Sequence, residues 1–501
     1  MSNIRKQSII SSVIVYFGFA LGFINTYLFT KKGSFTPEQY GLINLFIAIA
    51  NIMFSVANLG MLSFINKFYP YYKDNLEKKK NDLLTLAISI CILGFSLVVV
   101  AGFVFKEIVV QKYSTNSPEL VTYYYWLFPF GFGLTLYSVL EAYAWQEQKS
   151  VLTNFLREVL WRLFTTILIV LFFVGIIPRF PAFIKWYALT YIFLSLVLGM
   201  YLLVSGKITI YFSISRVTKK FYKKIIALAG FVWGGGLVYN IAFVFDTLVI
   251  AAVMPNGLVN AGIYSLAQNI ASLIQAPQRG IISASVGPLS RAWKDKDLDR
   301  IKQIYKRSSI NQLIFSVAMF CLIFMNFTDG IHTFSLKETY TLALPAFLFI
   351  GLMRILDMGT GLNSQIIGTS VFWRFEFFTG IVLLTLTLPL NYLLTKTFGV
   401  IGPAMSNLFA FTVYNFIRCM YLWKKLRMQP FSPQTFYTLI VGGVCYGLTY
   451  LVFRSNGGLA WIIARSAMFI TLFGAGAMYL KLTPDLFHII DSVKGRIRKK
   501  V

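Results

Sequence analysis

Two charged residues, Asp246 and Arg279, stand inside long apolar runs of this sequence. Placing a charged side chain within hydrocarbon costs at least about 3 kcal/mol, so such a residue is a candidate for function. An arginine can bind an anion through paired hydrogen bonds. An aspartate can hold a proton or a cation, or serve as a counter-charge. Because a helix rises about 1.5 Å per residue, the two charges fall at different depths. The sequence therefore predicts two separate charges in one cavity, with Arg279 as the anion site, rather than an ion pair.

A polar stripe leads to Arg279 and continues one turn beyond it. Its members recur every three or four residues, which places them on one face of a helix. They are Ser265, Gln268, Ser272, Gln275, Arg279 and Ser283. An earlier apolar run carries Asn44, Asn51 and Asn58 at intervals of seven, again on one face. Hydrogen bonds between helices would explain such stripes, but two equivalent stripes, one containing arginine, favour a hydrated cavity. The residues predicted to contact a bound molecule are Arg279, Gln275, Gln268, Ser272, Asn51, Asn58 and Asn25.

The elements that must position these residues are apolar helices. The 501 residues are 57% hydrophobic and 13% charged, whereas soluble proteins average about 25% charged residues. A membrane-spanning helix needs about 20 mostly apolar residues, and the sequence contains fourteen such runs. They cover residues 8–30, 40–66, 82–105, 121–145, 156–177, 186–204, 225–253, 260–288, 308–327, 339–358, 371–392, 401–423, 433–453 and 459–480. The chain is therefore predicted to be an all-α polytopic membrane protein with about 14 transmembrane helices.

The formal net charge of +27 would suggest nucleic acid binding in a soluble protein. Here most Lys and Arg fall in alternate loops and at both ends of the chain, which the positive-inside rule explains when both termini are cytoplasmic. No nucleic acid partner is expected. Further charges lie near the cytoplasmic ends of the runs, where long side chains can reach the interface. They either contact lipid or form a charged cytoplasmic mouth, for which the candidates are Arg354, Asp357, Arg418 and Glu141.

The sequence also contains a faint internal repeat. A shift of 221 residues places Asn25-Thr26 on Asp246-Thr247, Gly41-Leu42 on Gly262-Ile263, and Asn58 on Arg279. Spans 1–6 and 7–12 are thus predicted to be parallel repeats, an arrangement common in transporters. The predicted divisions are an N-terminal lobe (1–206), a basic cytoplasmic linker (207–224), a C-terminal lobe (225–423), and two further helices with a basic tail (424–501). The formal charges of the cavity would come from the second repeat.

Several kinds of catalytic site have no counterpart in the sequence. There is neither a G-x-x-x-x-G-K-[ST] phosphate-binding loop nor a G-x-S-x-G nucleophile motif. The two histidines and four cysteines show no metal-ligand spacing. The sequence therefore predicts no catalytic residue, no metal site and no cofactor, and the protein is not expected to be an enzyme.

Short motifs around the two charges resemble a known family. They include Asp246-Thr247-Leu248-Val249-Ile250, the run from Ala261 to Ala267, and Pro288-Leu289-Ser290-Arg291. This pattern is similar to the polysaccharide-biosynthesis exporters, the Wzx-type flippases of lipid-linked oligosaccharides. These belong to the MATE-like (MOP) superfamily, together with drug exporters and peptidoglycan-precursor flippases. Many members have Asp-x-Gly where this chain has Asn58-Leu59-Gly60, which puts in doubt a charge role at that place.

The resemblance implies a V-shaped bundle of two lobes in a bacterial cytoplasmic membrane. It implies that a polyprenyl-diphosphate-linked oligosaccharide crosses from the inner to the outer leaflet by alternating access, with membrane lipids as neighbours and polysaccharide polymerase machinery as a partner. Coupling to H⁺ or Na⁺, with Asp246 as the coupling acid or counter-charge, is left open. Two alternatives also remain: a cation-coupled drug or small-molecule exporter of the MATE type, and a membrane glycan polymerase or ligase, against which the short outer loops argue.

Overall fold

The computed structural model describes residues 3–208, 210–453, 457–483 and 485, and the described part is helical throughout. Nine of its helices are long and apolar enough to cross a membrane, and two shorter apolar helices, Ile14–Thr30 and Val244–Val253, accompany them. Each of the fourteen predicted runs falls on helical elements. The helical class follows from physics, because a backbone in hydrocarbon must satisfy its own hydrogen bonds. A total of fourteen spans, cytoplasmic termini and the V shape remain predictions.

The chain divides into two compact units, unit 1 (Met1–Gly262) and unit 2 (Ile263–Val501). Their boundary falls within helix α13 (Gly257–Ala271), not in the basic segment 207–224 where the sequence places a linker between lobes. The reason lies in α12 (Arg216–Val253), which packs against α2 (Pro37–Ala57) and α3 (Met61–Asn75) of unit 1. The predicted N-terminal and C-terminal lobes are defined by the internal repeat, whereas the two units are defined by contacts between helices.

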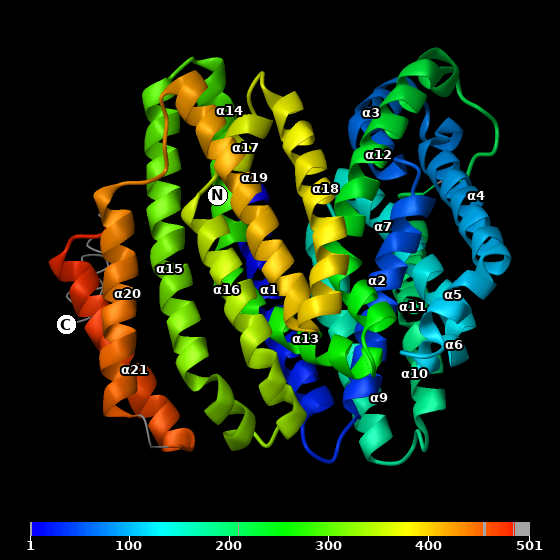
Figure 1. Cartoon of the computed structure of the whole chain (residues 1–501). Helices are drawn as coiled ribbons and strands as arrows, with labels where there is room; N and C mark the ends of the chain where they lie inside the picture. Colours follow the sequence, from blue (N-terminus) through cyan, green and yellow to red (C-terminus); the bar gives the residue numbers. More distant parts are fainter. Residues whose placement is uncertain (1–2, 209, 454–456, 484, 486–501) are drawn as a thin grey trace, which may run out of the picture. The chain divides into compact units, whose positions relative to one another are not determined.

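Unit 1 is built around α7 (Leu127–Gln146), which packs against α2, α4 (Leu83–Val104) and α11 (Thr190–Val204) (Figure 1). Its other elements are α1 (Asn3–Thr30), η1 (Lys78–Lys80), α5 (Lys106–Tyr113), α6 (Pro118–Thr122), η2 (Tyr124–Trp126), α8 (Ser150–Asn154), the π-helix η3 (Phe155–Leu160), α9 (Trp161–Phe173) and α10 (Phe180–Ala188). Large aromatic side chains fill its interior, among them Phe46, Phe130, Tyr137 and Tyr187.

The predicted second span is broken into α2 and α3 at Asn58. The Asn58 amide donates to the carbonyls of Phe54 and Ser55, both at 3.0 Å, and its oxygen accepts from the Gly60 backbone N–H at 2.9 Å. Gly60 has a φ of 76°, which glycine adopts without strain. The Trp233 indole of α12 donates to the carbonyls of Ser55 at 2.9 Å and Val56 at 3.1 Å. Polar bonds thus hold α12 against the end of α2.

Two glycines that the repeat places at equivalent positions contact each other within unit 1. A Cβ atom on Gly41 of α2 would overlap the Leu258 carbonyl and approach the Gly262 nitrogen to 3.0 Å. A Cβ on Gly262 would lie 2.6 Å from the Pro37 carbonyl oxygen. The beginnings of α2 and α13 therefore meet backbone to backbone, as small residues allow at helix crossings in membranes.

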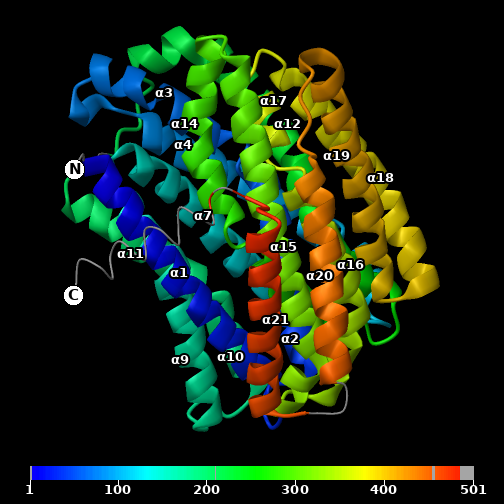
Figure 2. The ribbon, with the colours of Figure 1, turned by 90° about the vertical axis from the view of Figure 1, so that its left-hand side faces the viewer.

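Near the start of unit 2 the helix is interrupted before Pro277, a residue type that commonly interrupts helices. The second half of α13 is followed by the 3₁₀ turn η4 (Ser272–Gln275), and α14 (Gln278–Lys294) starts after Pro277. Helices α20 and α21 pack against α15, as Figure 2 shows, and α19 packs against α16 and α18. The bounds are α15 (Leu298–Thr333), η5 (Glu338–Leu342), α16 (Ala343–Gly359), α17 (Asn363–Gly368), α18 (Trp373–Phe398), α19 (Ile401–Leu426), α20 (Pro433–Val452) and α21 (Leu459–Tyr479).

Candidate functional site

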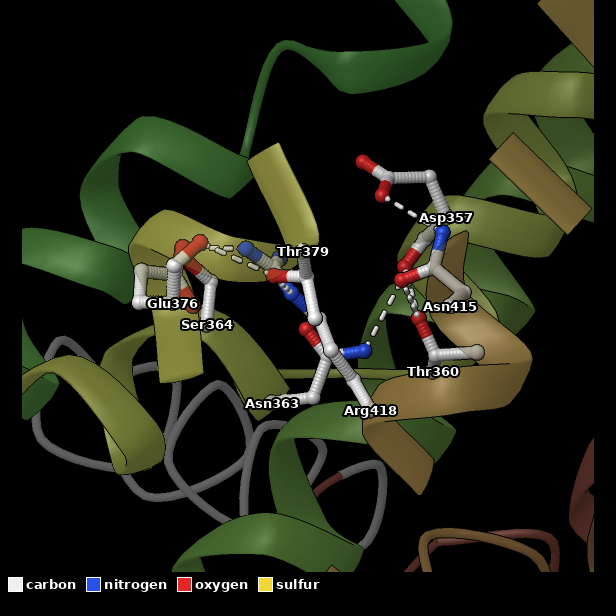
Figure 3. Close-up of polar contacts among 8 residues, drawn as sticks. All are labelled: Asp357, Thr360, Asn363, Ser364, Glu376, Thr379, Asn415 and Arg418. Carbon is white, nitrogen blue, oxygen red and sulfur yellow. Dashed lines mark hydrogen bonds and ion pairs between the residues drawn. The ribbon is translucent and has the colours of Figure 1, made fainter. Parts of the chain in front are cut away.

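A polar network joins four helices of unit 2 (Figure 3). It begins at the end of α16, passes through α17, and ends on facing sides of α18 and α19. Its eight members, hereafter the unit 2 network, are Asp357, Thr360, Asn363, Ser364, Glu376, Thr379, Asn415 and Arg418. In apolar helices each polar group needs a partner, and this network supplies partners from four elements at once.

Arg418 is the most enclosed charge of the network. Its side chain is 3% exposed and forms an ion pair with Glu376 of α18. Its Nε donates to the Thr379 hydroxyl at 3.1 Å, and its guanidinium carbon lies 3.7 Å from the centre of the Tyr414 ring. Ser364 donates to the same Glu376 oxygen at 2.6 Å. This arrangement fixes α17, α18 and α19 together and leaves the guanidinium little exposed surface for an anion.

Asn415 connects the other half of the network. Its amide oxygen accepts from Thr360 at 3.0 Å and from Asn363 at 2.8 Å, and its amide nitrogen donates to Asp357 at 3.2 Å. All three partners use side-chain atoms, two from the end of α16 and one from α17. Because Asn363 and Ser364 are neighbours on α17, this half and the Arg418 half share one short helix.

The network continues to the polar stripe of the sequence. Gln278, the first residue of α14, donates to the second oxygen of Asp357 at 3.2 Å, and it accepts from Gln275 of η4 at 3.0 Å. The predicted cavity residue Gln275 and the predicted mouth residue Asp357 therefore belong to one hydrogen-bonded set, and the mouth residue Arg418 lies in the other half, which shares α17 and α19 with it. Amides and hydroxyls arranged in this way can exchange hydrogen bonds with sugar hydroxyls or water.

The remaining predicted residues of unit 2 are less closely connected. The Ser272 hydroxyl donates to the Asn269 carbonyl at 2.6 Å within its own helical segment. Gln268 and Arg354 are half-buried in α13 and α16. The backbone of Arg279 is in α14, directly after Gln278, but its side chain and that of Ser283 lie outside the described residues. The predicted role of Arg279 as an anion site stays a prediction.

In unit 1 the predicted asparagines make hydrogen bonds that support the fold. Asn25 donates to the Arg162 carbonyl at 2.8 Å and accepts from Thr166 at 2.6 Å, which joins α1 to α9. Asn51 donates to the Ile47 carbonyl at 2.8 Å within α2, and Asn58 ends that helix. Asp246 lies in α12 and is 3% exposed. Contacts of these four residues with a bound molecule or ion stay predictions.

Glu141, the fourth predicted mouth residue, lies in unit 1, whereas the other three lie in unit 2. It pairs with Arg157 at 2.9 Å, and a second pair joins Glu158 to Arg162 at 3.0 Å. Arg157 and Glu158 lie within the π-helix η3, and Arg162 follows it in α9. A π-helix has hydrogen bonds that span five residues instead of four, and it often marks a functional segment. Sequence reasoning did not detect it.

Sequence reasoning also missed the five uncharged members of the unit 2 network. Gln278, which bonds to the network through Asp357, could have been found, since it follows Gln275 by three residues and extends the stripe. Thr360, Asn363 and Asn415 give no such signal, because short polar side chains commonly bond to their own helix. Among the described residues, no group of three His, Cys, Asp or Glu is placed to hold a metal ion.

Comparison with known proteins gives the following similarities. Residues 4–293 match the polysaccharide biosynthesis protein family, and no curated protein matches the sequence. A structure of the lipid II flippase MurJ in an inward closed conformation is similar over 94% of this chain and 99% of its own, with a TM-score of 0.72 and 16% identity. An inward-facing MATE multidrug transporter of the MOP superfamily covers 82% of this chain and 95% of its own, with a TM-score of 0.64 and 17% identity.

A MOP superfamily transporter from Pyrococcus furiosus, described as having a binding pocket of reversed polarity, is also similar. It covers 84% of this chain and 96% of its own, with a TM-score of 0.54 and 16% identity. At these identities the solved structures establish the fold, which is the helical fold of MurJ and the MATE transporters. The family match covers more than half of the sequence. The chain is therefore a membrane protein of the polysaccharide biosynthesis protein family.

Proposed function

We propose that this protein is a flippase that moves a polyprenyl-diphosphate-linked oligosaccharide across a bacterial cytoplasmic membrane by alternating access. Family membership supports a step in polysaccharide synthesis. The observation that carries the proposal is the connected polar set from Gln275 through Gln278 to Asp357 and Asn415, within helices that are otherwise apolar. Polar groups in such surroundings are usually functional, and amides of this kind suit the hydroxyls of sugars.

Each of these residues has a role that its functional group suits. Gln275 and Gln278, both half-buried, offer one donor or acceptor each beyond the bonds they already make, and they bind sugar hydroxyls. Arg279 follows them and binds the diphosphate, for which a guanidinium is well shaped. Arg418 and Glu376 hold the helices that carry Asp357 and Asn415 in place. A polysaccharide polymerase would receive the translocated product.

Asp246 supports a second candidate, a cation-coupled exporter of small molecules. A carboxylate that is 3% exposed in an apolar helix is suited to bind a proton or Na⁺. The fold is shared with MATE transporters, which agrees with this candidate as well as with a flippase. Arg279 argues against organic cations as cargo, because like charges repel.

The test is a flipping assay with purified protein in vesicles that contain a fluorescent lipid-linked oligosaccharide. Arg279→Ala is expected to lower the rate at least about tenfold, and Arg279→Lys to retain part of it, since lysine keeps the charge but not the paired geometry. Lys302→Gln, an exposed charge change in α15, serves as the control. Wild-type rates for both Arg279 variants would refute the diphosphate contact.

The same vesicles separate the two candidates. A flippase transports the lipid-linked sugar and ignores organic cations. An exporter releases a fluorescent organic cation when a proton or sodium gradient is imposed, and Asp246→Asn abolishes that release. Cation transport without movement of the lipid-linked sugar would refute the flippase proposal.

A further inference from the structure

The segment between α11 and α12 presents a row of apolar side chains outward from unit 1. Residues 210–215 are not helical, and the chain bends at Ser213. Ile210, Phe212 and Ile214 are 64%, 85% and 60% exposed. These three side chains form the apolar row. Bulky apolar side chains with this exposure need a partner or an apolar solvent.

The backbone of the segment is fastened to unit 1. The Tyr211 backbone N–H donates to the Thr85 hydroxyl at 3.1 Å, and the Ser215 N–H donates to the Asp82 carboxylate at 2.9 Å. The same Asp82 oxygen accepts from Thr218 at 2.7 Å. Asp82 and Ser215 are buried. These hydrogen bonds therefore hold the apolar row in a fixed orientation. The sequence predicts only a basic linker over 207–224.

Basic side chains flank the apolar row. Ser215 caps α12, and the first three turns of that helix bury Val217, Thr218 and Ile225 against unit 1. Their opposite face is exposed and strongly basic. It carries Arg216, Lys219, Lys220, Lys223 and Lys224, together with Tyr222 and Ile226. No Asp or Glu occurs between Lys207 and Phe245 in the sequence, so nothing on this stretch offsets the charge.

We propose that the connector surface, defined as Ile210, Phe212 and Ile214 with the five basic residues of α12, binds the anionic phospholipids of the cytoplasmic leaflet. Apolar side chains that insert among acyl chains, next to lysines that reach phosphates, are the composition of interfacial membrane anchors. The alternative is a protein partner with matching acidic and apolar groups. A lipid surface is favoured because the apolar row is followed directly by the lysine-rich start of α12. The proposal is independent of the cargo.

The position of the apolar row is tested by site-directed spin labelling of the full chain in vesicles. The four native cysteines are buried, so a label at Phe212→Cys reports the apolar row and a label at Lys302→Cys, in a separate variant, reports an exposed charged site of unit 2. Insertion predicts that the label at 212 is relaxed by oxygen and shielded from a water-soluble nickel complex, with the reverse at 302. Equal access of both labels to the nickel complex would overturn the proposal, and so would an immobile label at 212 shielded from both.

The lipid specificity is tested without any lipid-linked sugar. The protein is reconstituted in phosphatidylcholine vesicles that contain a trace of spin-labelled phosphatidylglycerol, and the motionally restricted fraction is measured. Replacing Lys219, Lys220, Lys223 and Lys224 by Gln is expected to lower the relative affinity for phosphatidylglycerol at least about fivefold. The matched control replaces Lys294, Arg300, Lys302 and Lys306 by Gln, the same change in net charge at exposed sites of unit 2. Equal losses of phosphatidylglycerol affinity in the two variants would show a general charge effect and refute the connector surface as the binding site.

Discussion

The two units place ion pairs between neighbouring helices, but they enclose them differently. In unit 1, Arg157 at the start of the predicted fifth span pairs with Glu141 of α7, and the Arg157 side chain is 45% exposed while that of Glu141 is 5% exposed. In unit 2, Arg418 of α19 pairs with Glu376 at the start of α18, and the Arg418 side chain is 3% exposed while that of Glu376 is 29% exposed. Among the described residues, the hydroxyl groups of Ser364 and Thr379 also bond to the second pair.

The difference in exposure decides what each pair contributes. An exposed ion pair is weakened by water and by the entropy of its side chains, so it stabilises by about 1 kcal/mol or less. An enclosed pair costs desolvation when it forms, yet removing one partner leaves a charge without compensation. The unit 1 pair leaves its arginine open to water, whereas the unit 2 pair encloses its arginine and bonds it to hydroxyl groups. We infer that Arg418 is held firmly between its helices and that Arg157 is held less firmly.

The largest expected effect is therefore at Arg418. Arg418→Ala should destabilise unit 2 by roughly 3–5 kcal/mol, since Glu376 loses its cation. Arg157→Ala should cost less, about 1–3 kcal/mol, because the buried carboxylate of Glu141 loses its cation but the half-exposed site of the arginine opens to water. Thermal unfolding in detergent, followed by tryptophan fluorescence, compares the two. The double variant Arg418→Met/Glu376→Leu should recover much of the loss, because it removes both charges. Equal destabilisation by the two single variants would contradict the comparison.

A smaller effect is expected at Asn415, the connecting residue of the unit 2 network. Asn415→Leu keeps the volume but removes one donor and an acceptor used twice. Each buried group without a partner costs about 1–3 kcal/mol, and Asp357 keeps its bond from Gln278. We expect a loss of about 2 kcal/mol in the same unfolding experiment. Thr412→Val on the exposed side of α19 is the control, because that hydroxyl bonds only within its own helix, to Leu408 at 2.6 Å.

The helical class of the fold was predictable from the sequence because apolar runs of spanning length leave a backbone few other solutions. The breaks within runs were harder. Asn58-Leu59-Gly60 interrupts a run that reads as one helix by hydropathy, and the cause is local: a side-chain cap and positive φ values of 43° at Leu59 and 76° at Gly60. Hydropathy averages over such details. Pro277 was visible as a break because proline removes a backbone donor.

The candidate site was predictable where it is charged and hidden where it is neutral. Asp357 and Arg418 are costly in apolar helices, so they attract notice in the sequence. Thr360 and Asn363 lie more than 50 residues from Asn415, and no local pattern indicates that they meet. Asn25, whose place in the repeat predicts a cavity, makes hydrogen bonds that join α1 to α9, and its contact with a bound molecule stays a prediction. Residue type points to the charged members, and long sequence separation conceals which neutral side chains meet.

The smallest expected effect concerns another ion pair of unit 1, Glu147 with Lys207, which lies at the beginning of the segment between α11 and α12. Glu147 accepts from Tyr69 and pairs with Lys207 at 2.9 Å, and the Lys207 carbonyl accepts from Tyr143 at 2.8 Å. Burial pushes the pKa of Glu147 upward, but the hydrogen bonds from Tyr69 and Lys207 outweigh it, and the net pKa lies below the ordinary 4.5. The contribution of this pair to stability is therefore complete above about pH 5 and is lost as the pH falls through the lowered pKa.

This pH response distinguishes a water-accessible pair from an enclosed one, and hydrogen exchange measures it. Between pH 6 and pH 4, after correction for the intrinsic exchange rate, protection of residues 207–215 should decrease in the wild-type protein. Glu147→Gln should remove most of that dependence, because the carboxylate that pairs with Lys207 is gone. Helix α19 around Arg418 should show no matching change in either protein. A wild-type connector whose protection is constant over this range would mean that Glu147 and Lys207 contribute nothing to its attachment, and that the tie between Asp82 and Ser215 is sufficient.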